Sequence, residues 1–169
     1  MINIVLYEPE IPQNCGNIMR TCVATNAKLH LIKPLGFRVD DATIKRSGVN
    51  YIESCDFNVY ENIDDFYAKN KGEIYYLTRY GHKPHTEINC VDPNKDYFFV
   101  FGKESTGIPS ALLKPHIDHC LRIPMSDKVR ALNLSNTVAI VVYEALRQQG
   151  YPNLYLEEPH KSKNYIEEK

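Results

Sequence analysis

The segment FGKESTG, residues 101–107, places two glycines five positions apart directly after the apolar run Tyr97–Val100. That is the glycine spacing of a phosphate-binding loop, which continues with Lys and Ser or Thr to hold the phosphates and Mg²⁺. Ile108 and Pro109 follow here instead. The loop therefore lacks the side chains that hold nucleotide phosphates, and its ligand has to be sought with the help of other segments.

A second polar loop, YEPEIPQNCGNIMRTC, follows the first apolar run of the chain. Its prolines stiffen the approach, Asn14 is a candidate cap for the helix that follows, and Gly16 permits close backbone contact. Arg20 comes about one turn into that helix, so an anion or a polar substrate could sit at the helix N-terminus. A rigid connection with a surface arginine explains the same residues.

Two more loops follow apolar runs: IPMSDKVRALNLS at 123–135 and LTRYG at 77–81. Loops at the carboxyl ends of parallel strands are where α/β proteins bind ligands. These loops together predict a small-molecule site assembled from several strand ends.

Familiar catalytic and metal-binding motifs are missing from the chain. It contains no G-x-G-x-x-G early on, no G-x-S-x-G and no H-E-x-x-H. HKPH and HIDH could each ligate a metal, but acidic or cysteine ligands are not arranged around them. We therefore expect no metal.

The elements that must position these loops alternate between strand-like and helix-like patterns. Strands are predicted over Ile2–Tyr7, Leu29–Lys33, Phe57–Tyr60, Ile74–Thr78, Tyr97–Phe101 and His119–Ile123, and helices over Gly16–Ala27, Asp40–Arg46, Asn62–Asn70 and Leu134–Gln149. This order predicts an α/β fold with a largely parallel sheet flanked by helices.

The last of these helices is apolar on most sides, with Asn133 or Ser135 as its N-terminal cap and Gly150 at its end. A domain of 169 residues can bury such a helix only centrally or against another subunit. We therefore expect a homodimer.

Composition bounds the remaining possibilities. The length of 169 residues suits one domain, and a formal net charge of -1 gives no global attraction for nucleic acid, so a polyanion must meet a local patch. Five cysteines without a C-x-x-C pair argue against disulfides and zinc. No run is long enough to cross a membrane, and cytoplasm is the expected compartment.

The segments PEIPQNCGNIMRT, FGKESTG and IPMSDKVRALNLSN, in this order and spacing, resemble the three signature motifs of the SPOUT superfamily of RNA methyltransferases. The resemblance is closest to the single-domain TrmL (YibK) type, which methylates the ribose 2′-OH of the wobble nucleotide 34, a cytidine or modified uridine, in tRNA. It covers 3–152, with 153–169 left as a polar extension. It implies a trefoil knot over roughly 74–149, S-adenosylmethionine as cofactor, and the anticodon stem-loop, with leucine tRNAs expected, as substrate.

The resemblance also implies roles for individual residues. Catalytic roles fall on Arg20, Asn14, Glu104 and Asn133. Cofactor contacts, many of them through main chain, fall on Leu77, Thr78, Gly102, Glu104, Gly107, Ile123, Pro124, Met125, Ala131, Leu132, Asn133 and Ser135. A purely architectural role is the alternative for Glu104 and Asn133.

Candidates for RNA phosphate contact are Arg20, Lys45, Arg46, Arg79, Lys103 and Arg130, each of which could instead be an ordinary solvated charge. The family usually has Ser where Ala131 stands, so any hydroxyl role of that residue is absent here. Two other functions are compatible with the sequence: 2′-O-methylation of ribosomal RNA or of another tRNA position, and a catalytically idle protein that binds cofactor or RNA.

Overall fold

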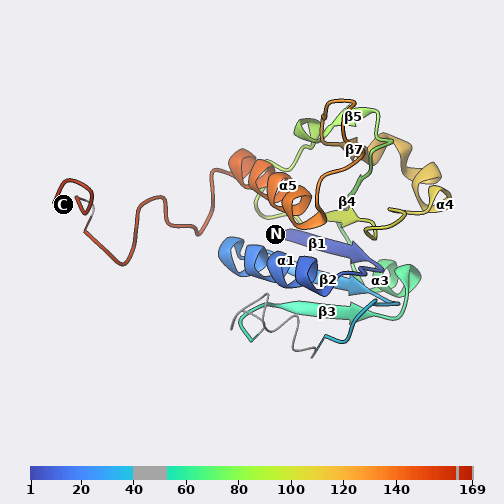
Figure 1. Ribbon diagram of the computed structural model, residues 1–169, viewed down its shortest axis with the longest axis horizontal. Coiled ribbons are helices and arrows are strands. Elements are labelled where there is room, and N and C mark those ends of the chain that lie inside the picture. Colours follow the sequence, from blue (N-terminus) through green and yellow to red (C-terminus); the bar gives the residue numbers. More distant parts are fainter. Residues whose placement is uncertain (40–52, 163, 169) are drawn as a thin grey trace.

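The computed structural model describes residues 1–39, 53–162 and 164–168. Its centre is one seven-stranded sheet with the order β3-β2-β1-β6-β4-β7-β5, in which every paired strand is parallel (Figure 1). The strands are β1 (Ile2–Tyr7), β2 (Lys28–Ile32), β3 (Phe57–Tyr60), β4 (Glu73–Leu77), β5 (Lys83–Pro84), β6 (Tyr97–Phe101) and β7 (Cys120–Arg122). The predicted α/β fold with a parallel sheet is confirmed, whereas the helix expected over Asp40–Arg46 lies outside the described residues.

Helices cover both faces of the sheet, and α1 and α5 run side by side (Figure 1). They are α1 (Pro12–Thr25), α3 (Ile63–Lys69), α4 (Ser110–Leu113) and α5 (Leu134–Gln149), with 3₁₀ turns η1 (His85–Glu87) and η2 (Lys114–His119). The side chains of α1 and α5 belong to one buried apolar cluster, and those of α3 and α4 to another.

The middle strands β1 and β6 are almost wholly apolar because both faces are covered, and the buried Asn3 of β1 is the exception. All five residues of β6, Tyr97–Phe101, are buried, and so are Ile2–Leu6 of β1. Alternate side chains enter opposite clusters: Ile4 and Leu6 pack towards α1 and α5, whereas Val5 packs towards α3 and α4. Strands β1 and β6, which are far apart in the sequence, thus form the buried centre of the sheet.

The start of α1 differs from the sequence prediction. Pro12 stands in the first turn, and the capping residue Ile11 makes no side-chain cap. Proline is favoured there because its missing N–H has no helical partner to lose. Asn14 therefore lies inside the first turn, the predicted cap is wrong, and its amide is available for the contacts described below.

The predictions for α5 are confirmed at both ends. The Asn133 side chain caps the helix by accepting a hydrogen bond from the Ser135 N–H at 2.9 Å, and Gly150 ends it in the left-handed conformation. Val138, Val141 and Ala145 are buried. The sequence predicts that α5 is buried on most sides, but only the face that includes these three residues is fully buried.

The chain beyond α5 first stays on the core and then leaves it. Leu154 packs on the main cluster and the Asn153 carbonyl accepts a hydrogen bond from the Asn26 amide. Figure 1 shows the remaining segment running away from the sheet. Among the described residues, no helix is both long and apolar enough to span a membrane.

Candidate functional site

The strand-end loops predicted to carry chemistry surround one cavity of about 770 Å³. Its wall is formed by the ends of β4, β6 and β7, by the loop that precedes α5, and by the start of α1. Because parallel strands present their carboxyl ends at the same edge, loops far apart in the sequence meet there. The cavity is where the fold brings the first, second and third motif segments together.

Gly102 lets two stretches of main chain approach each other at the floor of this site. A Cβ at Gly102 would stand 2.2 Å from the carbonyl carbon of Gly107 and 2.4 Å from the nitrogen of Ile108. The Lys103 carbonyl accepts a hydrogen bond from the Gly107 N–H at 2.9 Å, so the loop folds back on itself. Only glycine at position 102 fits this closed loop, which leaves main-chain groups rather than side chains facing a ligand.

Glu104 joins this loop to the loop between β1 and α1. One carboxylate oxygen accepts from the Glu10 N–H at 2.8 Å, and the other accepts from the Ile11 N–H at 3.2 Å and from the Asn14 amide at 2.9 Å. Three donors on one carboxylate fill most of its lone pairs. Glu104 therefore positions the first loop.

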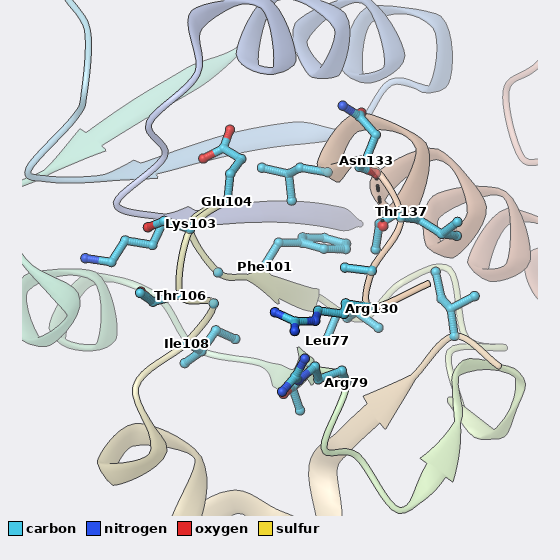
Figure 2. Close-up of a pocket in the computed structure, with 18 of the residues that line it drawn as sticks. Leu77, Arg79, Phe101, Lys103, Glu104, Thr106, Ile108, Arg130, Asn133 and Thr137 are labelled. Carbon is cyan, nitrogen blue, oxygen red and sulfur yellow. Dashed lines mark hydrogen bonds between the residues drawn. The ribbon is translucent and has the colours of Figure 1, made fainter. Parts of the chain in front are cut away.

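The third segment is tied in through two asparagines. The Asn133 amide donates to the Asn14 Oδ1 at 3.0 Å, while Asn133 Oδ1 accepts from the backbone N–H and the hydroxyl of Ser135. The Thr137 hydroxyl donates to the Asn133 carbonyl at 3.1 Å (Figure 2). Glu104, Asn14 and Asn133 thus form one polar chain that spans all three motif segments.

Three of the predicted RNA-binding cations line the cavity, but their settings differ. The Lys103 ammonium lies 2.8 Å from a carboxylate oxygen of Glu8, an ion pair that raises the Lys103 pKa, and it points away from the middle of the cavity (Figure 2). Arg79 and Arg130 reach towards the middle (Figure 2). Neither is paired with a carboxylate among the residues that the structure describes. The two guanidiniums therefore provide the positive charge available to an anion.

Apolar side chains also line the cavity. Leu77 and Phe101 are buried at the ends of β4 and β6, and Ile108, Ile123 and Leu132 belong to the same lining. Among the described lining residues there is no histidine, and the one carboxylate is that of Glu104, already bound to three donors. The wall suits a flat, uncharged ring system.

Most of the residues that sequence reasoning assigned to cofactor binding line this cavity. They are Leu77, Thr78, Gly102, Glu104, Gly107, Ile123, Met125, Ala131, Leu132 and Asn133. Pro124 and Ser135 are not among its lining residues, and Ser135 reaches it only through Asn133. Arg20 is exposed on α1 away from the lining, and Lys45 and Arg46 lie outside the described residues.

Several lining residues were missed. Thr137 lies one helical turn after Asn133, so the spacing of four could have indicated it. Thr106 sits inside the FGKESTG loop, and Tyr80 inside LTRYG, next to the arginine that was chosen for its charge. Tyr80 carried a usable signal, since an aromatic beside a cation is a common feature of RNA-binding surfaces.

Sequence comparison shows which known proteins this chain is related to. The family model described as the SpoU rRNA Methylase family matches residues 1–143. The tRNA (cytidine(34)-2'-O)-methyltransferase of Escherichia coli (strain K12) is 41% identical over 158 residues, which is 92% of this chain and 99% of the relative. This sequence similarity extends over nearly all of both proteins.

Solved structures of similar proteins point to the same family. A crystal structure from Bacillus anthracis superimposes with a TM-score of 0.89 at 55% identity, covering 94% of this chain and all of the other. A structure titled as giving insights into 2-OH methylation of C/U34 on tRNA has a TM-score of 0.82 at 35% identity, covering 89% of this chain and 97% of that one. The chain therefore belongs to the SpoU methylase family, and it is a methyltransferase of the SPOUT type.

Proposed function

We propose that this enzyme transfers a methyl group from S-adenosylmethionine to the ribose 2′-OH of nucleotide 34, a cytidine or modified uridine, in tRNA. The observation that carries the proposal is the polar chain Glu104–Asn14–Asn133, which fixes three motif loops around one cavity. The wobble position is supported by the relatives' named activity, whereas leucine tRNAs are inferred from the motif resemblance alone. Cytoplasm is the expected compartment, in keeping with five free cysteines.

The cavity fits the cofactor on its own chemistry. Gly102 brings main-chain N–H and C=O groups to the surface of the site, and Ile123 and Leu132 offer apolar contact to an adenine ring. No Lys and Ser pair for phosphates is needed, because this cofactor carries none. When bound, S-adenosylmethionine supplies a methyl group already activated by a sulfonium.

The chain's own residues then have to orient the acceptor and stabilise charge. Alignment of two reactants alone can contribute several kcal/mol to catalysis. Arg79 and Arg130 point into the cavity, so we assign them to phosphates that flank the acceptor ribose. The 2′-OH proton must leave, and a guanidinium, which stays protonated, is not its acceptor.

Arg20 is assigned to the phosphate beside the acceptor and to the developing alkoxide charge, by resemblance. In this chain it lies on the exposed side of α1. We infer that it acts across a homodimer interface. Ile140 and Tyr143 lie one turn apart on the neighbouring α5 and are 38% and 48% exposed, so a second copy packed on this side would bury both.

The fold inferred from the family includes a trefoil knot over roughly 74–149, and the domain is taken to span 1–152 with 153–169 as an extension. Strand β6 lies between β1 and β4, and β4 lies between β6 and β7, so the strands of this region are neighbours in the sheet but do not follow their order in the chain. Tracing the backbone of an experimental structure would decide whether the chain is knotted.

The decisive experiment is methyl transfer from labelled S-adenosylmethionine to bulk tRNA, followed by mapping of the modified nucleotide. The proposal expects label on the ribose of nucleotide 34. Label on ribosomal RNA or at another tRNA position would favour a different substrate of the same chemistry, and cofactor binding without transfer to any RNA would favour the idle protein.

Arg20→Ala tests the assignment of Arg20, with Arg38→Ala, an exposed arginine outside the cavity lining, as the matched control. Turnover at saturating tRNA should fall by roughly 100-fold for the loss of one donor that stabilises developing charge. The control should keep turnover near wild type. Unchanged turnover of the Arg20 variant would remove the residue from the mechanism.

A further inference from the structure

Tyr80 stands at the rim of the cavity with most of its side chain in water. It is 63% exposed, so much of the ring is open to solvent. It lies in the LTRYG loop that follows β4, directly after Arg79, and lines the same cavity as Arg130. None of the relationships described above assigns it a role.

One face of the Tyr80 ring is held by Arg79. The guanidinium carbon lies 4.7 Å from the ring centroid, and the Arg79 Nη2 donates a hydrogen bond to the Tyr80 hydroxyl at 2.7 Å. A cation over one face and a hydrogen bond at the phenol oxygen reduce the freedom of the ring. The high exposure of the side chain leaves the ring accessible for a second flat partner.

The backbone beneath the ring is fixed as well. The Tyr80 N–H donates to the Thr78 hydroxyl at 3.3 Å, and the Gly81 N–H donates to the Thr78 carbonyl at 3.2 Å, which closes a tight turn. A Cβ at Gly81 would stand 2.5 Å from the carbonyl carbon of Leu121, so the turn packs directly on β7. Tyr80 is therefore presented by an ordered turn.

RNA-binding proteins recognise unpaired nucleotides by stacking their bases on aromatic rings and guanidinium planes. Anticodon-loop bases are unpaired, and their stacking on an aromatic is tolerant of base identity. Arg130 lines the same cavity and has no carboxylate partner among the described residues, so its guanidinium is available to an RNA phosphate.

We propose that Tyr80, held by Arg79, stacks on the base of the acceptor nucleotide and thereby places its ribose at the cavity mouth. This inference rests on the proposed function, because it assumes an RNA substrate. Tyr80 is a positioning residue, since it contacts the base and not the reacting oxygen. Stacking would accept cytosine and uracil alike, which is consistent with a pyrimidine acceptor of either kind.

The test combines a protein change with an RNA change. Tyr80→Ala should weaken binding of an anticodon stem-loop RNA by roughly 5- to 150-fold, the range for loss of one stacked base. Tyr80→Phe, which keeps the ring, should recover most of that affinity. Tyr155→Ala, a change at an 83% exposed tyrosine outside the cavity lining, is the matched control and should bind as wild type.

An abasic residue at position 34 of the RNA completes a double-mutant cycle. If Tyr80 stacks on that base, wild type and Tyr80→Ala should bind the abasic RNA equally. As a spectroscopic readout, 2-aminopurine at position 34 should be quenched by wild type and remain bright with Tyr80→Ala. Binding of S-adenosylhomocysteine should be the same for both proteins.

The outcomes separate this inference from the proposed function. If wild type methylates nucleotide 34 but Tyr80→Ala binds every RNA as tightly as wild type, the stacking role is refuted and the function stands. Coupling to position 33 or 35 in place of 34 also overturns the assignment. If wild type neither binds nor methylates tRNA, the proposed function itself fails.

Discussion

The contact between Gly102 and Gly107 yields the sharpest prediction about the cavity. In Gly102→Ala the new methyl would lie 2.2 Å and 2.4 Å from backbone atoms, whereas ordinary contacts begin at 3.4 Å. The main chain of the loop would have to move by about 1 Å, and overpacking of this kind costs roughly 1–3 kcal/mol. A displacement of about 1 Å in a binding site can lower function roughly 100-fold.

Gly107 provides the matched comparison. A Cβ there meets nothing within 4 Å, but the backbone φ is +73°. Gly107→Ala should therefore lose only the free energy needed to hold alanine in the left-handed conformation, about 1–2 kcal/mol. Gly107→Asn should recover part of that free energy, because asparagine tolerates this region.

The assay is titration calorimetry with S-adenosylhomocysteine, with circular dichroism to show that each variant is folded. Gly102→Ala should bind roughly 100-fold more weakly than wild type, and Gly107→Ala within about tenfold of it. A folded Gly102→Ala that binds within threefold of wild type, or a Gly107→Ala that loses more affinity than Gly102→Ala, would refute the reasoning from close approach.

Three further predictions concern other parts of the molecule. Burial lowers the pKa of His30 from 6.5 to about 4, so as the pH falls the unfolded chain binds a proton on this histidine before the folded chain does. The neutral buried imidazole therefore contributes about 3 kcal/mol of stability, which is complete above pH 6.5 and is lost as the pH falls to 4. Urea unfolding of His30→Gln should show a flatter pH dependence than that of wild type. Arg130→Ala should reduce the salt dependence of tRNA binding by about one phosphate contact, whereas Lys103→Ala, whose ammonium is held by Glu8, should change it little. For the proposed homodimer, Ile140→Glu should raise the dissociation constant at least about 100-fold in sedimentation experiments by burying an unpaired charge, and an unchanged constant would exclude this face from the interface.

Much of the fold follows from the sequence because its signals are local. The apolar run Tyr97–Phe101 coincides with β6, and the cap and stop residues gave the bounds of α5 correctly. The two-residue strand β5 was missed, since Lys83 and Pro84 carry no strand pattern and pair only because β7 lies beside them. Pairing imposed by a neighbour leaves no trace in the strand's own residues.

The functional site, like the fold, has features that the sequence predicts and features that only the structure shows. Motif resemblance selected Asn133, but its partner Asn14 lies far along the chain and no local pattern reports this contact. The carboxylate of Glu104 bonds to backbone about 94 positions away, which could be known only from the fold. Similarly, Lys103 and Arg130 look alike as cations in the sequence, and only the structure distinguishes the one bound to Glu8.

The order of strands has a consequence for synthesis of the protein. β1 pairs with β2 on one side and with β6, residues 97–101, on the other. Until the ribosome has delivered β6, a growing chain that has already folded its first half leaves one flank of an apolar strand without partners. Such open edges invite association with other chains, and pairings this distant in sequence form slowly. The nascent polypeptide is therefore expected to depend most on chaperones during the interval before residue 97 emerges.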